Sequence, residues 1–231
     1  MLVAGSGIAE SLIKRATDCF NCGLALSYGS TETCGGITYL GPTECVQGAG
    51  ERLKSAGKVM SPARIEIRRP DNTICDPGEI GEIICFSDRL MDEYWRRPED
   101  TEKVLTKDGY KSGDAGYLDE EGYLFVVDRL KDMVISGGEN IYPVEIESVL
   151  YQHPDVLDAA VIGVPDVKWG EALLCILVLR ESATLESESV IEFLRSKIAG
   201  YKIPRRYVQI DALPRNASGK VVKPVLRERF V

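Results

Sequence analysis

The sequence predicts a mixed fold of the α/β and α+β classes, because three regions of different character follow one another. Apolar residues at near-helical spacing come first and run into a short buried strand. From about Ala56 the chain becomes a series of short strands and turns, and after Asp128 helices and strands alternate. At 231 residues, with 44% hydrophobic and 28% charged residues, the chain has the size and composition of a globular protein with a buried core.

Residues 1–45 are expected to form an α/β piece. The helix is predicted from Ser6, a candidate cap, to about Gly23, by apolar residues at Ile8, Leu12, Ile13, Ala16 and Phe20. A short buried strand, Leu24–Tyr28, follows and runs directly into Gly29-Ser30-Thr31-Glu32. Junctions of this kind between strand and loop commonly hold ligands in α/β sheets.

Residues 46–128 are expected to be rich in β-structure. Residues 64–68 alternate, Asp71-Asn72 forms a turn, 79–86 is strand-like, and Asp119–Gly122 closes a hairpin into 123–127. These short strands and turns predict a subdomain rich in β-structure.

Residues 132–231 are expected to form a separate small domain with its own core. Pro143 can open a helix through Leu150, and two apolar runs, 159–164 and 173–179, predict buried strands. A second helix is indicated by apolar residues that share one face, which are Val190, Ile191, Leu194 and Ile198. A last strand is expected at 207–210. About a hundred residues suffice for such a domain.

Charge and hydropathy exclude several classes of function. A net charge of −8 disfavours a nucleic-acid or anionic-membrane surface, and the basic residues of the last 30 positions are expected to be a solvated face. No apolar run approaches the roughly 18 residues of a membrane span. The sequence contains no recognisable secretory signal or targeting tail, so we expect a cytoplasmic protein.

The seven cysteines predict reduced thiols rather than a disulfide framework, because their number is odd and they are widely spread. A zinc site formed by Cys19, Cys22, Cys34 and Cys45 is an alternative, although the second pair has poor spacing for zinc. The other three are expected to be small core residues: Cys75, Cys85 and Cys175.

The sequence contains no complete example of the common nucleotide-binding or histidine-based catalytic signatures. Gly57-Lys58 and Gly219-Lys220 lack the rest of a Walker loop, and Gly5-Ser6-Gly7 lacks the third glycine of a dinucleotide fingerprint. His153, the sole histidine, leaves no multi-histidine site, and we expect it at the surface after the helix that precedes it.

Four separated motifs remain, and their order matters more than any one of them. They are Tyr28-Gly29-Ser30-Thr31-Glu32, Tyr110-Lys111-Ser112-Gly113-Asp114, Asp128–Asp132 followed by Ile135–Pro143, and Leu213–Lys220. Taken singly, each reads as an ordinary turn. As a set they resemble the adenylate-forming (AMP-binding) superfamily of acyl- and aryl-CoA ligases.

The resemblance implies specific roles for the residues of the first two motifs and for Arg129. Tyr28 would pack against adenine, the Thr31 hydroxyl would contact phosphate, and Glu32 would help to hold Mg²⁺, a cation suited to carboxylate oxygen. Asp114 would accept the ribose hydroxyls, and Arg129 would reach the ribose or a phosphate. The nucleotide-binding residues implied are Gly5, Ser6, Gly7, Tyr28, Gly29, Ser30, Thr31, Asp114, Arg129 and Lys220.

The later motifs imply a moving domain. Lys131 falls at the family's hinge, with residues 129–131 as the linker, in agreement with the change of pattern at Asp128. In the family, the strand that contains Gly137, Gly138 and Glu139 closes on the thiol-bearing arm of coenzyme A. Lys220 would be catalytic in the adenylation step, together with Thr31 and Glu32.

The implied protein is a partial acid–thiol ligase that uses ATP, Mg²⁺ and coenzyme A to activate a carboxylic acid. Residues 1–128 would be the end of the large N-terminal domain, a sheet edge plus a small β-barrel subdomain, and 132–231 the small mobile domain.

The family's Ser/Thr/Gly-rich phosphate loop is absent from these residues, so we expect poor adenylation by this chain alone. Two alternatives stay open: a catalytically incompetent nucleotide-binding or regulatory fragment, and an adenylation domain serving another thiol acceptor. A homo-oligomer or a missing N-terminal portion also stays open.

Overall fold

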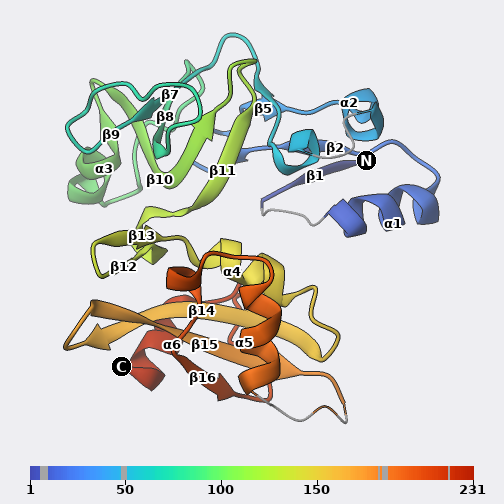
Figure 1. Ribbon diagram of the computed structural model, residues 1–231. Helices are drawn as coiled ribbons and strands as arrows, with labels where there is room; N and C mark the ends of the chain where they lie inside the picture. Colours follow the sequence, from blue (N-terminus) through green and yellow to red (C-terminus); the bar gives the residue numbers. More distant parts are fainter. Residues whose placement is uncertain (6–9, 48–50, 182, 184–186, 218) are drawn as a thin grey trace. The chain divides into compact units, whose positions relative to one another are not determined.

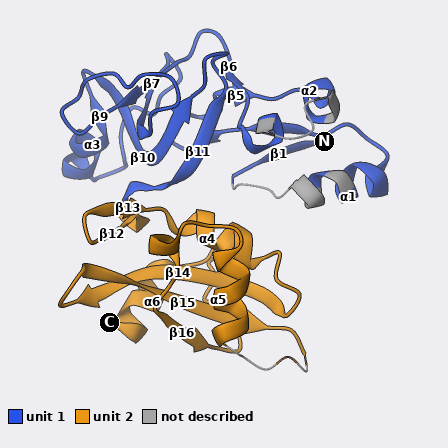
Figure 2. Cartoon of the chain, in the orientation of Figure 1, with its two compact units in different colours: residues 1–130 blue, residues 131–231 orange. Residues whose placement is uncertain are grey.

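The computed structural model describes residues 1–5, 10–47, 51–181, 183, 187–217 and 219–231. The chain forms two compact units, residues 1–130 and 131–231, shown in separate colours in Figure 2. The candidate cap Ser6, Gly7 of the predicted nucleotide site and Ser218 lie outside the described residues. The mixed α/β fold expected from the sequence is confirmed, and Figure 1 shows its elements in chain order.

Unit 1 begins with a parallel pair of strands joined by a helix. β1 (Leu2–Ala4) pairs with β2 (Ala25–Ser27), and α1 (Glu10–Phe20) connects them, as the helical spacing predicted. Ile13 of α1 is buried with Leu24 and Leu26, whereas Phe20 is exposed at the end of the helix. This piece is the α/β part of the unit.

Short elements connect this piece to the rest of unit 1. β3 (Gly29–Ser30) pairs with β4 (Gly35–Gly36), and β5 (Thr38–Tyr39) pairs with β6 (Lys58–Val59). Between β5 and β6 lie α2 (Pro42–Gln47) and a 3₁₀ turn, η1 (Glu51–Lys54). Strands of two residues have no periodicity to detect, so the sequence did not predict them.

The larger part of unit 1 is an antiparallel sheet with the strand order β11-β10-β8-β7. Its strands are β7 (Arg64–Arg68), β8 (Gly81–Phe86), β10 (Gly109–Leu118) and β11 (Leu124–Arg129). β9 (Leu105–Thr106) pairs with β10 and follows α3 (Pro98–Val104). Alternate residues of the strands make one core, which includes Ile65, Ile67, Ile83, Cys85, Tyr110 and Leu124.

β11 belongs to both cores of unit 1. Leu124 is buried in the core of the antiparallel sheet, while its neighbours Tyr123 and Phe125 are buried with Ile13 and Leu24 of the α/β piece. Successive side chains of a strand point to opposite faces, so one strand can serve two cores. The α/β piece and the sheet are therefore packed together within this unit.

Unit 2 is built around two long antiparallel strands, β14 (Val156–Asp166) and β15 (Gly170–Leu179). Their sheet has the order β13-β12-β15-β14, with β12 (Val134–Ser136), β13 (Glu139–Ile141) and β16 (Arg206–Gln209), which pairs in parallel with β15. Both apolar runs predicted as strands are buried except for Leu179 at the end of the second, which is half-buried, as expected for strands covered on both faces.

Helices cover the two faces of this sheet (Figure 1). α4 (Pro143–Leu150) and α5 (Ser187–Arg195) pack on Val161, Cys175 and neighbouring residues of one face. α6 (Lys223–Phe230) packs through Leu226 on Ile162, Leu174 and neighbouring residues of the other face. Two 3₁₀ turns also occur, η2 (Leu130–Asp132) before β12 and η3 (Gly200–Lys202) between α5 and β16. The result is a three-layer α/β/α arrangement with two cores.

His153 is buried, which corrects the expectation of a surface position. Its side chain is 6% exposed and lies edge-on to the ring of Phe193 on α5, with a centroid distance of 4.9 Å. Its Nδ1 accepts a hydrogen bond from the Asp155 amide at 3.2 Å. The sequence placed His153 correctly after α4, but it could not show that α5 covers this turn.

Cys85 and Cys175 are buried as expected, while Cys75 is half-buried beside the sheet core of unit 1. Burial raises the pKa of the Cys85 thiol to about 12, so this thiol stays protonated at neutral pH. None of the described helices is long and apolar enough to cross a membrane.

Leu174→Ala should destabilise unit 2 by about 2–5 kcal/mol, because it leaves a cavity between β15 and α6. Urea unfolding followed by Trp169 fluorescence, in a Trp95→Phe background that leaves one tryptophan, measures this change. Val167→Ala, at a fully exposed turn position, is the control and should change the free energy of unfolding by less than about 0.5 kcal/mol. Equal effects of the two variants would contradict the described core.

Candidate functional site

The Asp114 carboxylate joins two other residues of the predicted nucleotide site. Its Oδ2 accepts a hydrogen bond from the Tyr28 hydroxyl at 2.7 Å, and its Oδ1 pairs with Arg129 Nε at 2.8 Å. Three residues from three separated motifs therefore meet at one carboxylate. The Arg129 side chain is 52% exposed, so its guanidinium also faces solvent.

Local backbone structure explains how Asp114 is presented. Asp114 lies opposite Arg129 in the β10–β11 register, next to irregularities in the pairing of β10 with both neighbours. Gly113, with φ of +70°, allows the bend, and the Ser112 hydroxyl ties it by donating to Ile83 O at 2.7 Å and accepting from Asp114 N at 3.0 Å. Bulges of this kind commonly redirect a side chain.

Tyr28 is fixed as a hydrogen-bond donor. Burial raises the pKa of its hydroxyl far above the ordinary value, and the nearby Asp114 charge raises it further. Its amide donates to Thr38 Oγ1 at 2.9 Å, and Thr38 Oγ1 donates in turn to Ala56 O at 2.6 Å. Tyr28 thus stays neutral and oriented toward the carboxylate.

The loop from Gly29 to Gly36 is shaped by its own backbone. A Cβ on Gly29 would lie 2.1 Å from Gly35 O, so no side chain fits where β3 meets β4. Buried Thr33 closes the loop, because its Oγ1 accepts from Ser30 N at 2.8 Å and donates to Gly35 O at 2.7 Å. The Ser30 hydroxyl oxygen is buried without a hydrogen-bond partner among the described residues, and Thr31 is exposed.

Glu32 is held by a tyrosine that the sequence analysis did not select. The Tyr94 hydroxyl donates to Glu32 Oε1 at 2.6 Å, and Met91 N donates to Glu32 O at 2.8 Å. Burial raises the pKa of Glu32, but the Tyr94 hydrogen bond and other favourable interactions outweigh it, so the pKa is below its usual value. Glu32 is therefore a carboxylate at neutral pH. No sequence signal relates positions 32 and 94.

Tyr110 is buried and is influenced by the charges of both carboxylates. Burial raises its pKa to about 12, and the charges of Glu32 and Asp114 contribute in the same direction. Both carboxylates are thus within electrostatic reach of one buried ring. Tyr28 and Glu32 therefore belong to one cluster with Asp114 and Arg129 inside unit 1, and exposed Thr31 lies on the loop between Tyr28 and Glu32. We observe no comparable link for Gly5, which is exposed after β1, while Ser6 and Gly7 fall outside the described residues.

Unit 2 contains the glycine pair of the third motif. Gly137 and Gly138, with φ of +62° and +87°, form the two-residue turn between β12 and β13. They are not within a strand, which corrects the expectation from the resemblance. Gly137 N donates to Trp169 O at 2.9 Å, and a Cβ on Gly137 would meet the Trp169 ring at 2.7 Å. Glu139 follows the turn and is exposed.

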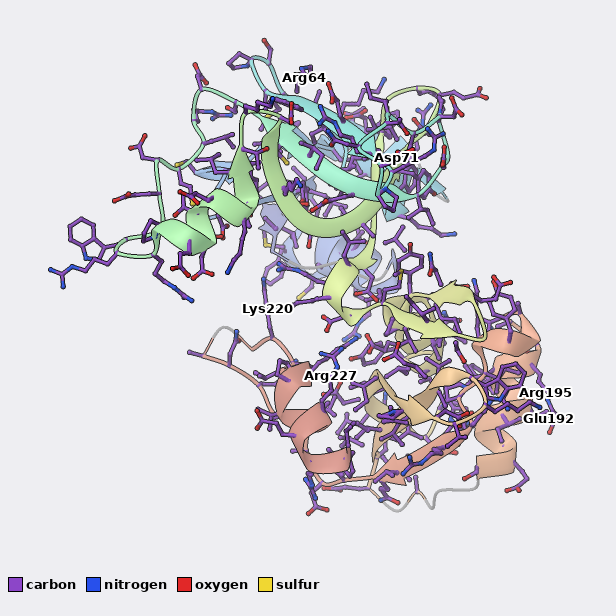
Figure 3. The ribbon with its side chains drawn as sticks, turned by 90° about the vertical axis from the view of Figure 1, so that its left-hand side faces the viewer. Arg64, Asp71, Glu192, Arg195, Lys220 and Arg227 are labelled. Carbon is purple, nitrogen blue, oxygen red and sulfur yellow. The ribbon has the colours of Figure 1, made fainter. Side chains whose placement is uncertain are left out.

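Lys220 is exposed on unit 2, in a loop just before α6, as Figure 3 shows. Its backbone is anchored to Asn216: Lys220 N donates to Asn216 Oδ1 and Asn216 N donates to Lys220 O, both at 2.9 Å. Gly219, with φ of +81°, makes the turn possible. The ammonium group is thus presented on a defined turn, without an ion pair among the described residues.

Lys131, the predicted hinge, lies in η2 and is exposed. The next residue, Asp132, is ion-paired with Arg227 of α6 at 2.9 Å. Asp132 is therefore anchored to the body of unit 2, whereas Lys131 is at the boundary between the two units.

The zinc alternative has no support in the structure. Among the described residues, no group of three or more His, Cys, Asp or Glu side chains could hold a metal ion. The cysteines are free thiols, including all four proposed ligands. One carboxylate such as Glu32 still suffices for Mg²⁺, which is usually bound through one or two carboxylates together with substrate phosphates.

The chemistry of this cluster suits a nucleotide. Two carboxylates can accept ribose hydroxyls or face a hard cation, the half-exposed guanidinium can bind an anion, and the unpartnered Ser30 hydroxyl offers a further polar atom.

Two family models match the chain: AMP-binding enzyme over residues 1–95, and AMP-binding enzyme C-terminal domain over residues 145–220. The long-chain-fatty-acid–CoA ligase FadD13 of Mycobacterium tuberculosis is 41% identical, over 99% of this chain and 44% of the ligase. The fatty acid–[acyl-carrier-protein] ligase ScoC of Streptomyces coeruleorubidus is 38% identical, over 98% of this chain and 43% of that protein.

A solved structure of o-succinylbenzoate CoA synthetase (MenE) from Bacillus subtilis, in complex with an acyl-adenylate intermediate, matches with a TM-score of 0.89 and 38% identity. The match covers 98% of this chain and 45% of that chain. Another structure of the same synthetase, with ATP and a magnesium ion, matches with a TM-score of 0.85 and 38% identity, over 99% and 45% of the two chains. This chain spans less than half the length of the relatives it matches. It belongs to the adenylate-forming AMP-binding enzymes, with an AMP-binding match over residues 1–95 followed by a C-terminal-domain match over residues 145–220.

Proposed function

We propose that this chain is the C-terminal part of an acyl- or aryl-CoA ligase, which joins a carboxylic acid to coenzyme A with ATP. The observation that carries the proposal is the meeting of Tyr28 and Arg129 at the Asp114 carboxylate. In the first step a carboxylate oxygen bonds to the α-phosphorus of ATP and pyrophosphate leaves. In the second step the thiol sulfur bonds to the acyl carbon, AMP leaves, and the thiol proton passes to solvent.

The nucleotide would be held by the cluster in unit 1. Asp114 can accept the ribose hydroxyls while Tyr28 and Arg129 keep its two oxygens in place, since each oxygen has more than one lone pair. The guanidinium of Arg129 would also reach a phosphate, and Tyr28 would pack against adenine. Ser30 and Thr31 would supply hydroxyls to the phosphates, with Gly5, Ser6, Gly7 and Gly29 completing the proposed site.

Glu32 is the proposed Mg²⁺ ligand in this chain. When bound, Mg²⁺ would screen the negative charge of the leaving pyrophosphate. Glu32 is ionised because its pKa is low, and the Tyr94 hydroxyl fixes one of its oxygens, so the other can face the cation. A solved relative that contains ATP and a magnesium ion supports this assignment.

Lys220 would supply the cation of the adenylation step. The attack brings two anions together, so positioned positive charge lowers the barrier. An exposed ammonium on a turn held by Asn216 can enter a site without carrying a competing acidic partner.

Thioester formation requires another surface near the acyl-adenylate, and we assign it to Gly137, Gly138 and Glu139. Rotation about Lys131 would exchange the Lys220 face for the glycine turn. The absence of side chains on Gly137 and Gly138 lets backbone close around the narrow thiol-bearing arm. The exposed position of Lys131 at the boundary of the two units supports a hinge there.

The thiol acceptor and the acid define the remaining part of the proposal. We favour coenzyme A over a carrier protein, because the segment Gly138–Pro143 resembles that of CoA ligases, although ScoC shows that a close relative is named for a carrier protein. Fatty acid metabolism in the cytoplasm is the proposed context, supported by the similarity to FadD13. Presenting the same acyl-adenylate to CoA and to a phosphopantetheinyl carrier protein separates the two acceptors.

The proposal is tested with a chimera in which this chain replaces the matching part of FadD13, so that the ligase supplies the remaining residues. We expect the chimera to catalyse carboxylate-dependent ATP–pyrophosphate exchange and the 231-residue chain alone to catalyse it poorly or not at all. A folded chimera that binds ATP without exchange would instead support an incompetent nucleotide-binding fragment.

Lys220→Ala in the chimera should reduce ATP–pyrophosphate exchange by about 10²–10³-fold, the usual effect of removing one preorganised donor. Thioester formation from supplied acyl-adenylate should be spared. Lys197→Ala, an exposed lysine after α5, is the matched control. Equal loss of both half-reactions in Lys220→Ala would reject the assigned role.

Asp114→Asn should raise the KM for ATP about tenfold or more, because it weakens charge-assisted hydrogen bonds to the ribose. The exchange assay at varied ATP concentration measures this change. Asp71→Asn, at the exposed turn labelled in Figure 3, should leave the KM unchanged. An unchanged KM in Asp114→Asn would remove Asp114 from the nucleotide site.

A further inference from the structure

Lys220 needs a defined position, yet it lies in an exposed loop without helix or strand. We call residues 214–222 the lysine loop. Its ends are anchored in unit 2, because Leu213 is buried in the core beneath α6 and Lys223 is paired with Glu147 at 2.9 Å. Anchored ends alone do not fix the tip, where small errors in the position of a catalytic group are costly.

Hydrogen bonds within the lysine loop fix the shape of the turn. Asn216 bonds to Lys220 through both its backbone and its side chain, and Gly219 N donates to Asn216 O at 2.9 Å. Arg215 and Val221 form an antiparallel bridge across the base. These bonds keep the turn closed, but they do not relate it to the sheet.

The Arg215 side chain connects the turn to the sheet. Its Nη1 donates to Gly219 O, the carbonyl directly before Lys220, at 2.5 Å. Its Nη2 forms an ion pair with Asp158 Oδ2, and Asp158 lies in β14. A planar guanidinium can make two such bonds in a fixed relative orientation, which a lysine ammonium does less well.

Asp158 is itself fixed at this point of the strand. Its Oδ1 accepts hydrogen bonds from the Tyr151 hydroxyl at 2.7 Å and from Ala159 N at 3.0 Å. Its side chain is 17% exposed, compared with 42% for Arg215. The carboxylate is thus an acceptor held in place on β14, a strand whose residues 159–164 are buried.

We propose that Arg215 is a positioning residue for Lys220, acting through its bridge between Gly219 O and the Asp158 carboxylate. This inference rests on the proposed function, because it assumes that Lys220 serves adenylation. A partly exposed ion pair of this kind contributes little to global stability. Its effect should therefore appear in the order of the lysine loop and in the adenylation step, not in the unfolding midpoint.

Amide hydrogen exchange of residues 215–222 in the 231-residue chain provides the first test. Arg215→Ala and Asp158→Ala should each speed exchange in this segment about three- to tenfold, the factor expected for loss of a partly exposed charge-assisted contact. Their urea midpoints should stay near that of the wild type. Arg195→Ala, an exposed arginine of α5 labelled in Figure 3, should change neither quantity. Unchanged exchange in Arg215→Ala overturns the proposal.

A double-mutant cycle separates the bridge from independent local effects. If Arg215 acts through Asp158, the double variant should exchange no faster than the faster single variant. Multiplication of the two single effects would show that the residues act independently, which also overturns the proposal.

The FadD13 chimera gives the catalytic readout. Arg215→Ala should lower kcat for ATP–pyrophosphate exchange about tenfold with an unchanged KM for ATP, and it should spare thioester formation from supplied acyl-adenylate. Arg215→Lys should recover part of the loss, since an ammonium can still pair with Asp158. If Arg215→Ala speeds amide hydrogen exchange in the lysine loop but leaves adenylation at the wild-type rate, the positioning role is overturned. A wild-type chimera without any ATP–pyrophosphate exchange activity would refute the proposed function. Amide hydrogen exchange would still decide whether Arg215 orders the lysine loop.

Discussion

The arrangement of the site in unit 1 depends on one carboxylate with two partners. Asp114 receives Tyr28 on one oxygen and Arg129 on the other, so a strand end, a bulge and the last residue of β11 are held at one point. Each partner is itself constrained, Tyr28 by burial and Arg129 by its cross-strand register. The positions of these proposed ligand-binding groups are thus set by the geometry of the sheet.

Unit 2 consists of a well-packed core and exposed loops that carry its residues of proposed function. Its two long strands, β14 and β15, are covered by helices on both faces, and β14 is paired with β15 along its length, which makes it a firm support for the groups attached to it. The exposed residues of proposed function, Lys220 and the glycine turn, lie on connections outside this core, where loops carry function on a fixed scaffold. Asp158 connects the buried sheet to the exposed loops, since it belongs to β14 and contacts the loop before α6.

The elements with strong local signals were predictable, and those that depend on distant contacts were not. The two apolar runs gave β14 and β15, and Pro143 marked the start of α4, because burial on both faces and proline at a helix start leave direct sequence patterns. α6 is largely polar, with Leu226 as its buried contact, and therefore has no clear periodicity. Likewise the four motifs marked the candidate residues, but Tyr94 and the burial of His153 arise from packing between segments far apart in sequence.

Gly29 illustrates that the residues of a motif carry different kinds of information. Its lack of a Cβ is dictated by the Gly35 carbonyl 2.1 Å from that position, so the fold requires glycine whether or not a nucleotide ever binds. Thr31 is exposed two residues later, and packing does not restrict it in the same way. On the proposed role of Thr31, a descendant that had lost catalysis would keep the glycine but would be free to lose the threonine. If Thr31 contacts phosphate as proposed, the threonine and not the glycine would distinguish active members of such a lineage from inactive ones.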